Sequence, residues 1–224
     1  IADDMLDSLE DMQRVHDFAE SPRCVVFTAY CEGDPRAAYV PETEDFVLCA
    51  DAGWKIAEKV GVTPDLVIGD FDSADAPKCG RVERHPVMKD DTDTMLCLKY
   101  GLKLGFERFV FIGGMGGRLD HTLGNLQTLA YGAQKGAQVE MCDESCRVCA
   151  VYNSSVRLER RKGKVSLFAM GDYCRGITTE GLLWRLDNGK LSGTFPLGVS
   201  NEYSADEAVV TVTDGTLLIV QTDD

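Results

Sequence analysis

The chain has 224 residues, of which 44% are hydrophobic and 27% charged, enough for one large domain or two small ones with an apolar core. No apolar run reaches the roughly 18 residues that a membrane-spanning helix requires, which excludes a transmembrane protein of that kind. With 23 Lys+Arg against 37 Asp+Glu, the formal charge of −14 repels phosphate backbones and argues against nucleic acid as a partner. An anionic substrate would need local positive charge, for which a divalent cation is a candidate.

Nine cysteines occur at irregular spacing, and no positively charged segment with an apolar centre opens the sequence. Both observations favour a reducing compartment, so we expect a cytoplasmic protein. Cys142, Cys146 and Cys149 have the C-x3-C-x2-C spacing that holds iron–sulfur clusters in some enzymes. Their place after the last predicted helix of the α/β part favours ordinary thiols instead.

Residues 3–18 carry apolar side chains at helical spacing with acids between them, which predicts a short acidic amphipathic helix. From Cys24 onward, short apolar runs alternate with helical stretches. The predicted strands are 24–31, 46–50, 66–69 and 108–114, and the predicted helices are 53–61, 92–105 and 119–136. This alternation predicts an α/β domain with a largely parallel sheet and flanking helices.

After about residue 145 the helical periodicity ends, and short β-rich segments are separated by Gly, Asp and Asn turns. These segments are 148–153, 156–161, 164–170, 176–186, 208–213 and 216–222. Their spacing predicts a C-terminal all-β sandwich. We therefore expect an acidic helical extension over 1–23, an α/β domain over 24–150 and a β-sandwich over 151–224.

Three acidic turns lie where predicted strands meet predicted helices. Asp70 and Asp72, in GDFDS, follow a strand directly, and both could reach one hard cation if the strand continued. The KDDTD segment at 89–93 precedes a predicted helix, and Asp51, in DAG, lies between a strand and a helix. Each turn alone has a simpler interpretation, as an acidic turn or a helix N-cap.

A glycine-rich turn, GGMGGRLDH at 113–121, also joins a predicted strand to a predicted helix. Its glycines let the backbone approach a ligand, the helix N-terminus favours an anion, and Arg118 suits phosphate. The P-loop ending and the Rossmann spacing are both missing, so a structural turn is an alternative, and His121 alone is more typical of a helix surface or core. Because parallel strands end at the same sheet edge, the four turns together predict one site for a metal and a polyphosphate.

Six motifs follow one another from about Cys24 to the C-terminus: DAG, PDLVIGDFDS, KDDTD, GGMGGRLDHTLGN, GLLW and GVSNEY. Their order resembles the thiamine pyrophosphokinase family. The resemblance implies an α/β domain that binds ATP and Mg²⁺, a β-sandwich that contributes the thiamine site, and a homodimer with sites at its interface. It also implies an enzyme that transfers the pyrophosphoryl group of ATP to thiamine, giving thiamine diphosphate and AMP.

The resemblance extends to individual residues. As magnesium-side catalytic carboxylates it implies Asp70, Asp72 and Asp93. Around the nucleotide it implies Asp51, Lys89, Asp90, Gly113, Gly114, Gly116, Gly117, Arg118 and Asp120, with Arg118 also in the catalytic set. Around thiamine it implies Trp184 against the rings, and Ser200 and Asn201 as hydrogen-bond partners of the aminopyrimidine.

Without the resemblance, the thiamine-side residues have ordinary structural interpretations. Trp184 would be a core aromatic, and Ser200 and Asn201 would form a turn. If GLLWRL is a strand, its alternation allows Trp184 to face either the core or a ligand. Two other functions also stay open: a pyrophosphokinase acting on another small alcohol, and a nucleotide- or thiamine-binding sensor without turnover.

Overall fold

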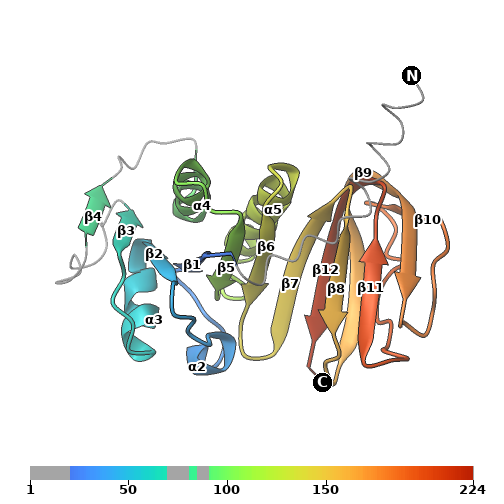
Figure 1. Ribbon diagram of the computed structural model, residues 1–224, viewed down its shortest axis with the longest axis horizontal. Helices are drawn as coiled ribbons and strands as arrows, with labels where there is room; N and C mark the ends of the chain where they lie inside the picture. Colours follow the sequence, from blue (N-terminus) through green and yellow to red (C-terminus); the bar gives the residue numbers. More distant parts are fainter. Residues whose placement is uncertain (1–20, 70–80, 85–90, 224) are drawn as a thin grey trace. The chain divides into compact units, whose positions relative to one another are not determined.

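The computed structural model describes residues 21–69, 81–84 and 91–223 (Figure 1). Its contacts divide the chain between Arg147 and Val148 into two compact units. The helix predicted over 3–18 lies outside the described residues, as do four predicted site residues: Asp70, Asp72, Lys89 and Asp90. Among the described helices, none is both long enough and apolar enough to cross a membrane.

The N-terminal unit is a parallel sheet whose strands alternate with helices (Figure 1). The strands are β1 (Arg23–Phe27), β2 (Phe46–Ala50), β3 (Leu66–Gly69), β4 (Arg81–Arg84), β5 (Arg108–Ile112) and β6 (Gln138–Cys142). The helices are α2 (Pro35–Ala38), the 3-10 turn η2 (Asp51–Gly53), α3 (Trp54–Lys59), α4 (Asp93–Lys103) and α5 (Leu119–Gln134). The predicted α/β fold is confirmed, while α2, β4 and β6 have no counterpart among the predicted elements.

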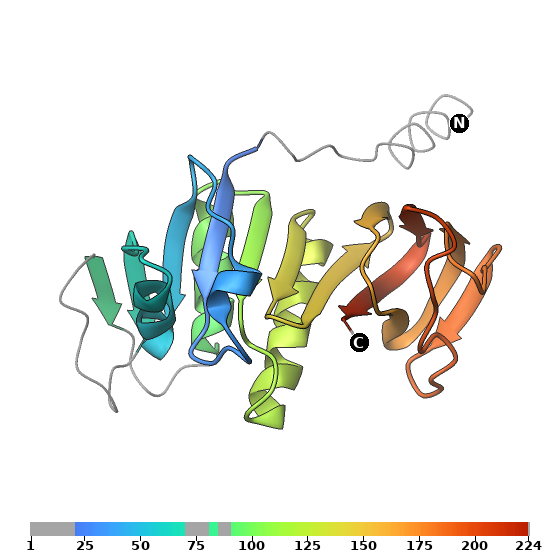
Figure 2. The ribbon, with the colours of Figure 1, turned by 90° about the horizontal axis from the view of Figure 1, so that it is seen from below.

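Helices cover both faces of this sheet, and β1 is consequently buried at every position (Figure 2). On one face, Val25 and Phe27 share a core with Ile56 of α3. On the other face, a Cβ added to Gly101 of α4 would lie only 2.5 Å from the Phe109 ring, so this helix packs closely on β5. The apolar runs read from the sequence are therefore strands buried from both sides.

The strand order β4-β3-β2-β1-β5-β6 contains one reversal, and every neighbouring pair in it is parallel. From β1 the chain proceeds to β4 on one side, and α4 then returns it to β5 on the other side of β1. Ligands of open parallel sheets bind beyond the carboxyl ends of the strands at such a reversal. The topology therefore places a binding site where β1 and β5 end.

A buried ion pair between Arg23 and Asp45 stabilises the start of β1. The guanidinium of Arg23 donates to Asp45 from Nε at 2.8 Å and from Nη2 at 2.7 Å, and the Tyr39 hydroxyl donates to the same carboxylate at 2.9 Å. Burial raises the pKa of the Asp45 carboxyl, but these hydrogen bonds outweigh it and hold the pKa below its usual range. The pair ties β1 to the segment that leads into β2.

The C-terminal unit is antiparallel. Its strands are β7 (Cys146–Tyr152), which begins before the division, β8 (Ser155–Glu159), β9 (Lys164–Glu180), β10 (Gly189–Ser192), β11 (Glu207–Thr211) and β12 (Asp214–Thr222). The long β9 has two glycines at positive φ, Gly171 and Gly176, and it pairs first with β12 and then, at its end, with β11. The predicted C-terminal all-β region is confirmed, and its described strand pairs are antiparallel.

The segment 181–188, whose first six residues were predicted as the end of the 176–186 strand, is irregular instead. Of this segment only Leu182 forms a bridge, an isolated antiparallel pair with Tyr203. The expected alternation is therefore absent: Leu182 is 1% exposed, whereas Leu183 and Trp184 are 54% and 58% exposed. This result places the indole of Trp184 outside the core.

Candidate active site

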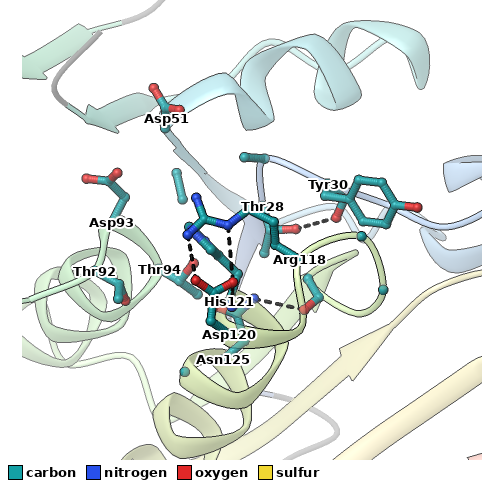
Figure 3. Close-up of a pocket in the computed structure, with 16 residues that line it drawn as sticks. Thr28, Tyr30, Asp51, Thr92, Asp93, Thr94, Arg118, Asp120, His121 and Asn125 are labelled. Atoms are coloured by element: carbon teal, nitrogen blue, oxygen red, sulfur yellow. Dashed lines mark hydrogen bonds and ion pairs between the residues drawn. The ribbon is translucent and has the colours of Figure 1, made fainter. Parts of the chain in front are cut away.

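A cavity of about 580 Å³ lies at the reversal point of the parallel sheet (Figure 3). Its walls come from the segments that follow β1, β2 and β5 and from the first turns of α4 and α5. The lining residues are Thr28, Ala29, Tyr30, Ala50, Asp51, Thr92, Asp93, Thr94, Gly114, Gly116, Gly117, Arg118, Asp120, His121, Gly124 and Asn125. The cavity therefore occupies the place where open parallel sheets bind ligands.

Asp51 enters this cavity from a constrained backbone directly after β2. Its φ is +47°, in the left-handed region that non-glycine residues rarely adopt. Gly69, at the end of β3, approaches so closely that an added Cβ would lie 2.9 Å from the Asp51 Cα. A Cβ on Gly53 would similarly lie 2.1 Å from the carbonyl oxygen of Phe27. Two glycines thus allow neighbouring strands to fix the position of the Asp51 carboxylate.

The first turn of α4 contributes Asp93 to the cavity. The two described acids of the KDDTD motif, Asp91 and Asp93, have different surroundings. Thr92 is the N-cap, and its hydroxyl accepts a hydrogen bond from the Met95 N–H at 3.2 Å. Asp91 forms an ion pair with Lys99 at 2.7 Å. Asp93 lines the cavity together with Asp51 (Figure 3). Capping and surface pairing therefore account for Thr92 and Asp91, and Asp93 is the acid of this turn that reaches the cavity.

The glycine loop after β5 requires glycine at each of its four glycine positions. Gly113, Gly114, Gly116 and Gly117 all have positive φ, between 63° and 91°. A Cβ on Gly113 would also lie 2.2 Å from the Tyr30 carbonyl oxygen. The loop therefore has backbone without side chains beside the cavity, so a ligand can approach it closely.

Hydrogen bonds fasten the glycine loop to its surroundings on both sides. The Gly114 N–H donates to the Tyr30 carbonyl at 2.7 Å, and the Asn125 Nδ2 donates to the Gly114 carbonyl at 2.8 Å. The buried Thr28 hydroxyl lies 2.9 Å from the Tyr30 carbonyl and 3.0 Å from the Ile112 carbonyl, so it joins the ends of β1 and β5. The loop is thus held in place by β1 on one side and α5 on the other.

The tyrosine ring of Tyr30 covers the second pair of glycines. Added Cβ atoms on Gly116 and Gly117 would each lie 3.2 Å from this ring. The Tyr30 hydroxyl donates to the Glu32 carboxylate, and this hydrogen bond raises the pKa of the hydroxyl. Tyr30 therefore forms a wall of the cavity that is anchored outside it.

The N-terminus of α5 carries an exposed, paired arginine. The Arg118 guanidinium donates to Asp120 from Nε at 3.1 Å and from Nη2 at 2.5 Å (Figure 3). The hydrogen bond from Arg118 lowers the pKa of the Asp120 carboxyl to about 2. No side chain caps this helix, so the partial positive charge of its first N–H groups faces the region of Arg118. Cation and helix terminus together make this wall suitable for an anion.

The predicted site residues thus fall into three groups. At the cavity lie Asp51, Asp93, Gly114, Gly116, Gly117, Arg118 and Asp120, with Gly113 adjacent in the chain. Outside the described residues lie Asp70, Asp72, Lys89 and Asp90. In the C-terminal unit lie Trp184, Ser200 and Asn201.

Nine further lining residues were not predicted as site residues, among them Thr28, Tyr30, Thr94 and Asn125. The polar Thr28 inside an otherwise apolar run is a signal that β1 ends there. A buried amide in the middle of a helix, as at Asn125, is a similar signal, because such a side chain needs a hydrogen-bond partner.

Among the described residues, no group of three His, Cys, Asp or Glu side chains is arranged to hold a metal ion. The cavity nevertheless contributes two carboxylates, that of the predicted metal ligand Asp93 and that of Asp51, which was predicted beside the nucleotide. Carboxylate oxygens are the ligands that Mg²⁺ prefers. The donor set therefore fits Mg²⁺.

The cysteine spacing noted in the sequence does not correspond to such a site either. Cys142 is buried at the end of β6, and Cys146 and Cys149 are half-buried on β7. All three belong to the described part of the chain, in which no metal-binding group occurs. An iron–sulfur cluster therefore has no structural support here.

Comparison with known families identifies the family of the chain. Two family models match the chain: "Thiamin pyrophosphokinase, catalytic domain" over residues 38–141, and "Thiamin pyrophosphokinase, vitamin B1 binding domain" over residues 154–217. The chain belongs to the thiamin pyrophosphokinase family. It is accordingly an enzyme with thiamine diphosphokinase activity, and the resemblance inferred from the six motifs is confirmed.

Individual relatives support the assignment to this family. A thiamine pyrophosphokinase of Bacillus subtilis (strain 168) is 25% identical over 183 residues, which cover 78% of this chain and 86% of that protein. Thiamine pyrophosphokinase 1 of Oryza sativa subsp. japonica is 25% identical over 177 residues, 70% of this chain and 64% of that protein.

Solved structures share the fold. The B. subtilis thiamine pyrophosphokinase superposes with a TM-score of 0.80 at 22% identity, covering 90% of this chain and 99% of that chain. Yeast thiamin pyrophosphokinase gives a TM-score of 0.69 at 16% identity, covering 96% of this chain and 90% of that chain.

Proposed function

We propose that this chain transfers the pyrophosphoryl group of Mg-ATP to the hydroxyl of thiamine, and that the cavity of the N-terminal unit holds the polyphosphate. One observation carries the assignment of the cavity. The carboxylates of Asp51 and Asp93 line the same 580 Å³ space as the glycine loop and the N-terminus of α5. A metal–polyphosphate complex needs these two kinds of wall, one for the cation and one for the phosphate oxygens.

The phosphate oxygens bind along the glycine loop and Arg118. Gly114, Gly116 and Gly117 have no side chains to keep an anion away from the backbone, and the first turn of α5 contributes its N–H groups. Arg118 is paired with Asp120, and both side chains are largely exposed, at 72% and 66%. An exposed pair is held weakly, so a phosphate can replace Asp120 as partner of the guanidinium. Lys89, Asp90 and Gly113 join this set on the family resemblance.

The metal side is formed by Asp51 and Asp93 at the cavity, with Asp70 and Asp72 assigned from the family resemblance. Mg²⁺ held there would offset the negative charge that develops on the phosphates during transfer. The strained backbone of Asp51 and the Thr92 cap of α4 hold the Asp51 and Asp93 carboxylates in place. We assign no general base, since positioning and electrostatics dominate in loose phosphoryl-transfer transition states.

Thiamine recognition belongs to the C-terminal unit, which matches the vitamin B1 binding domain. Trp184 offers an indole that is 58% exposed, suited to a planar cationic ring. Ser200 and Asn201 belong to the same unit, and Ser200 has a positive φ of 65°. The acidic composition of the chain, with its formal charge of −14, also favours a cationic substrate.

We further propose a homodimer and a cytoplasmic location. Several large apolar side chains of the C-terminal unit are exposed, among them Leu183, Phe195, Leu197 and Val199. Burial of such side chains in a subunit interface removes their contact with water. Light scattering tests the assembly: a fully active monomer at low concentration would contradict the dimer. The irregular spacing of the nine cysteines supports the proposed location.

Asp93→Asn tests the assignment of the cavity. We expect about a 100-fold loss of thiamine-dependent AMP formation, because the variant removes a carboxylate that faces the metal–phosphate complex. Asp91→Asn is the matched control, since Asp91 lies in the same turn but pairs with Lys99 on the surface. Near-normal turnover of Asp93→Asn at low Mg²⁺ concentration, or equal losses in both variants, would remove Asp93 from the site.

A further inference from the structure

The carboxamide of Asn201 is engaged by the backbone of Trp184. Its Oδ1 accepts hydrogen bonds from the Trp184 N–H at 3.0 Å and the Glu202 N–H at 2.9 Å, and its Nδ2 donates to the Trp184 carbonyl at 2.7 Å. Asn201 is only 9% exposed. An amide oxygen accepts two hydrogen bonds, so the acceptor side of this amide is fully used inside the protein.

The backbone of Asn201 is itself fixed to the sheet. Its N–H donates to the Val165 carbonyl at 2.8 Å, and the Val165 N–H donates to the Asn201 carbonyl at 2.9 Å. Val165 is a fully buried residue of β9. Asn201 therefore links a rigid strand to the Trp184 backbone, which lies in an irregular segment.

Hydrogen bonds at Gly181 and Leu186 attach the two ends of the segment that carries Trp184, and the Asn201 link attaches its middle. Residues 181–188 form no regular strand, and the Leu183 N–H donates to the Glu202 carbonyl at 2.9 Å. Asn201 completes the attachment by bonding both backbone groups of the next residue, Trp184. Where packing does not fix a side chain, its backbone determines the Cα–Cβ direction and limits the rotamers that it can adopt. The indole of Trp184 is such a side chain.

We infer that Asn201 is a positioning residue, which acts on thiamine by holding the Trp184 indole in place and not by a direct hydrogen bond to the aminopyrimidine. This inference rests on the proposed role of Trp184 in thiamine binding. The family resemblance implies that Asn201 hydrogen-bonds the aminopyrimidine, and the positioning role replaces that one. Ser200 keeps its proposed role as a hydrogen-bond partner of the aminopyrimidine.

A double-mutant cycle tests the inference. Asn201→Asp keeps the shape of the side chain but replaces the Nδ2 donor with an oxygen that faces the Trp184 carbonyl. We expect kcat/KM for thiamine to fall about tenfold, or about 1.4 kcal/mol, in the otherwise unchanged enzyme. In a Trp184→Ala background the same substitution should have less than about a twofold effect, since the indole that it misplaces is gone. The KM for ATP should not change in either background.

Two outcomes would overturn the inference, and they differ in what else they affect. An equal tenfold fall in both backgrounds would show that Asn201 contacts thiamine directly, and the role of Trp184 would stand. An unchanged kcat/KM for thiamine in Trp184→Ala would remove both the role of Trp184 and the inference, while the activity itself would stand. Glu202→Gln is the matched control, because it alters only the surface ion pair with Lys164.

A spectroscopic measurement separates positioning from a purely structural role. In a Trp54→Phe background, Trp184 is the only tryptophan, since the chain contains two. Asn201→Asp should change the emission and lower the anisotropy of this tryptophan without thiamine, at a temperature where the protein is folded. Asn201→Ser provides the same comparison with a neutral side chain if the aspartate variant folds poorly. Unchanged emission and anisotropy in both folded variants would contradict the inference.

Discussion

The substitution Asn125→Asp perturbs the glycine loop without changing the shape of the side chain that holds it. Asn125 is 7% exposed, and its Nδ2 donates to the Gly114 carbonyl at 2.8 Å. In the variant, a carboxylate oxygen takes the place of this donor and faces the carbonyl oxygen. The bond is lost, and the two oxygens repel each other. Because Gly114 is also bonded to Tyr30, the loop has to shift between its two attachments.

The expected magnitude follows from the burial of this contact. Leaving a buried acceptor without its donor costs about 1–3 kcal/mol of the free energy of unfolding. For a protein of this size, each kcal/mol lowers the Tm by about 2–4 °C, so a loss of about 2 kcal/mol corresponds to about 4–8 °C. A displacement of about 1 Å in a positioning loop costs on the order of 100-fold in rate, so we expect kcat/KM for ATP to fall by about that factor.

The assay combines thermal unfolding with steady-state kinetics for both substrates. Thr128→Val is the matched control, because Thr128 is also buried on α5, 1% exposed, but its hydroxyl bonds the Gly124 carbonyl of the same helix at 3.0 Å. The control should lose some stability and keep its kcat/KM for ATP. If Asn125→Asp loses stability yet matches the control in kcat/KM for ATP, the glycine loop is not the phosphate site.

Further predictions follow from the packing around the site and from the buried ion pair. Gly69→Ala places a Cβ against the Asp51 backbone, so turnover should fall at least about tenfold, and unchanged turnover would argue against a fixed Asp51. Asp45→Asn leaves the buried Arg23 guanidinium with the half-exposed Glu42 as its remaining carboxylate partner and should lower the free energy of unfolding by about 3 kcal/mol near pH 7. Because the folded-state pKa of Asp45 is lowered, this stabilisation is present above about pH 4 and lost as the pH falls through that lowered value; urea unfolding at a series of pH values that showed the opposite trend would contradict it. Trp184→Ala should raise the thiamine KM far more than the ATP KM with only mild destabilisation, whereas a large fall in Tm with both KM values unchanged would return this residue to a core role.

The position of the cavity could be predicted from the sequence because it depends on local patterns. The apolar runs of β2 and β5 end at Asp51 and Gly113, and strands that are parallel end at the same edge. The first turn of α4 was also readable, because Thr92 and Asp93 are residues typical of helix N-termini. Strand ends and helix N-termini can be recognised from residues that are close together in the sequence.

The features that escaped prediction depend on contacts that are distant in the sequence. The run 24–31 looks like one strand, yet β1 ends at Phe27 because the Thr28 hydroxyl bonds the carbonyl of Ile112, 84 residues away. This contact turns Tyr30 into a wall of the cavity.

On the thiamine side, Asn201 looks like a turn residue until its bonds to Trp184, 17 residues earlier, are known. Alternation could not locate the indole, because the segment around it is held by a side chain and not by a strand ladder.

Product analysis with doubly labelled ATP tests the central claim most directly. The purified chain is incubated with thiamine, Mg²⁺ and ATP that carries distinguishable labels on its α- and γ-phosphates. Pyrophosphoryl transfer predicts AMP with the α label and thiamine diphosphate with the γ label in equal amounts, and neither product without thiamine. Formation of ADP, release of the γ label as free pyrophosphate, or no thiamine-dependent turnover would contradict the account.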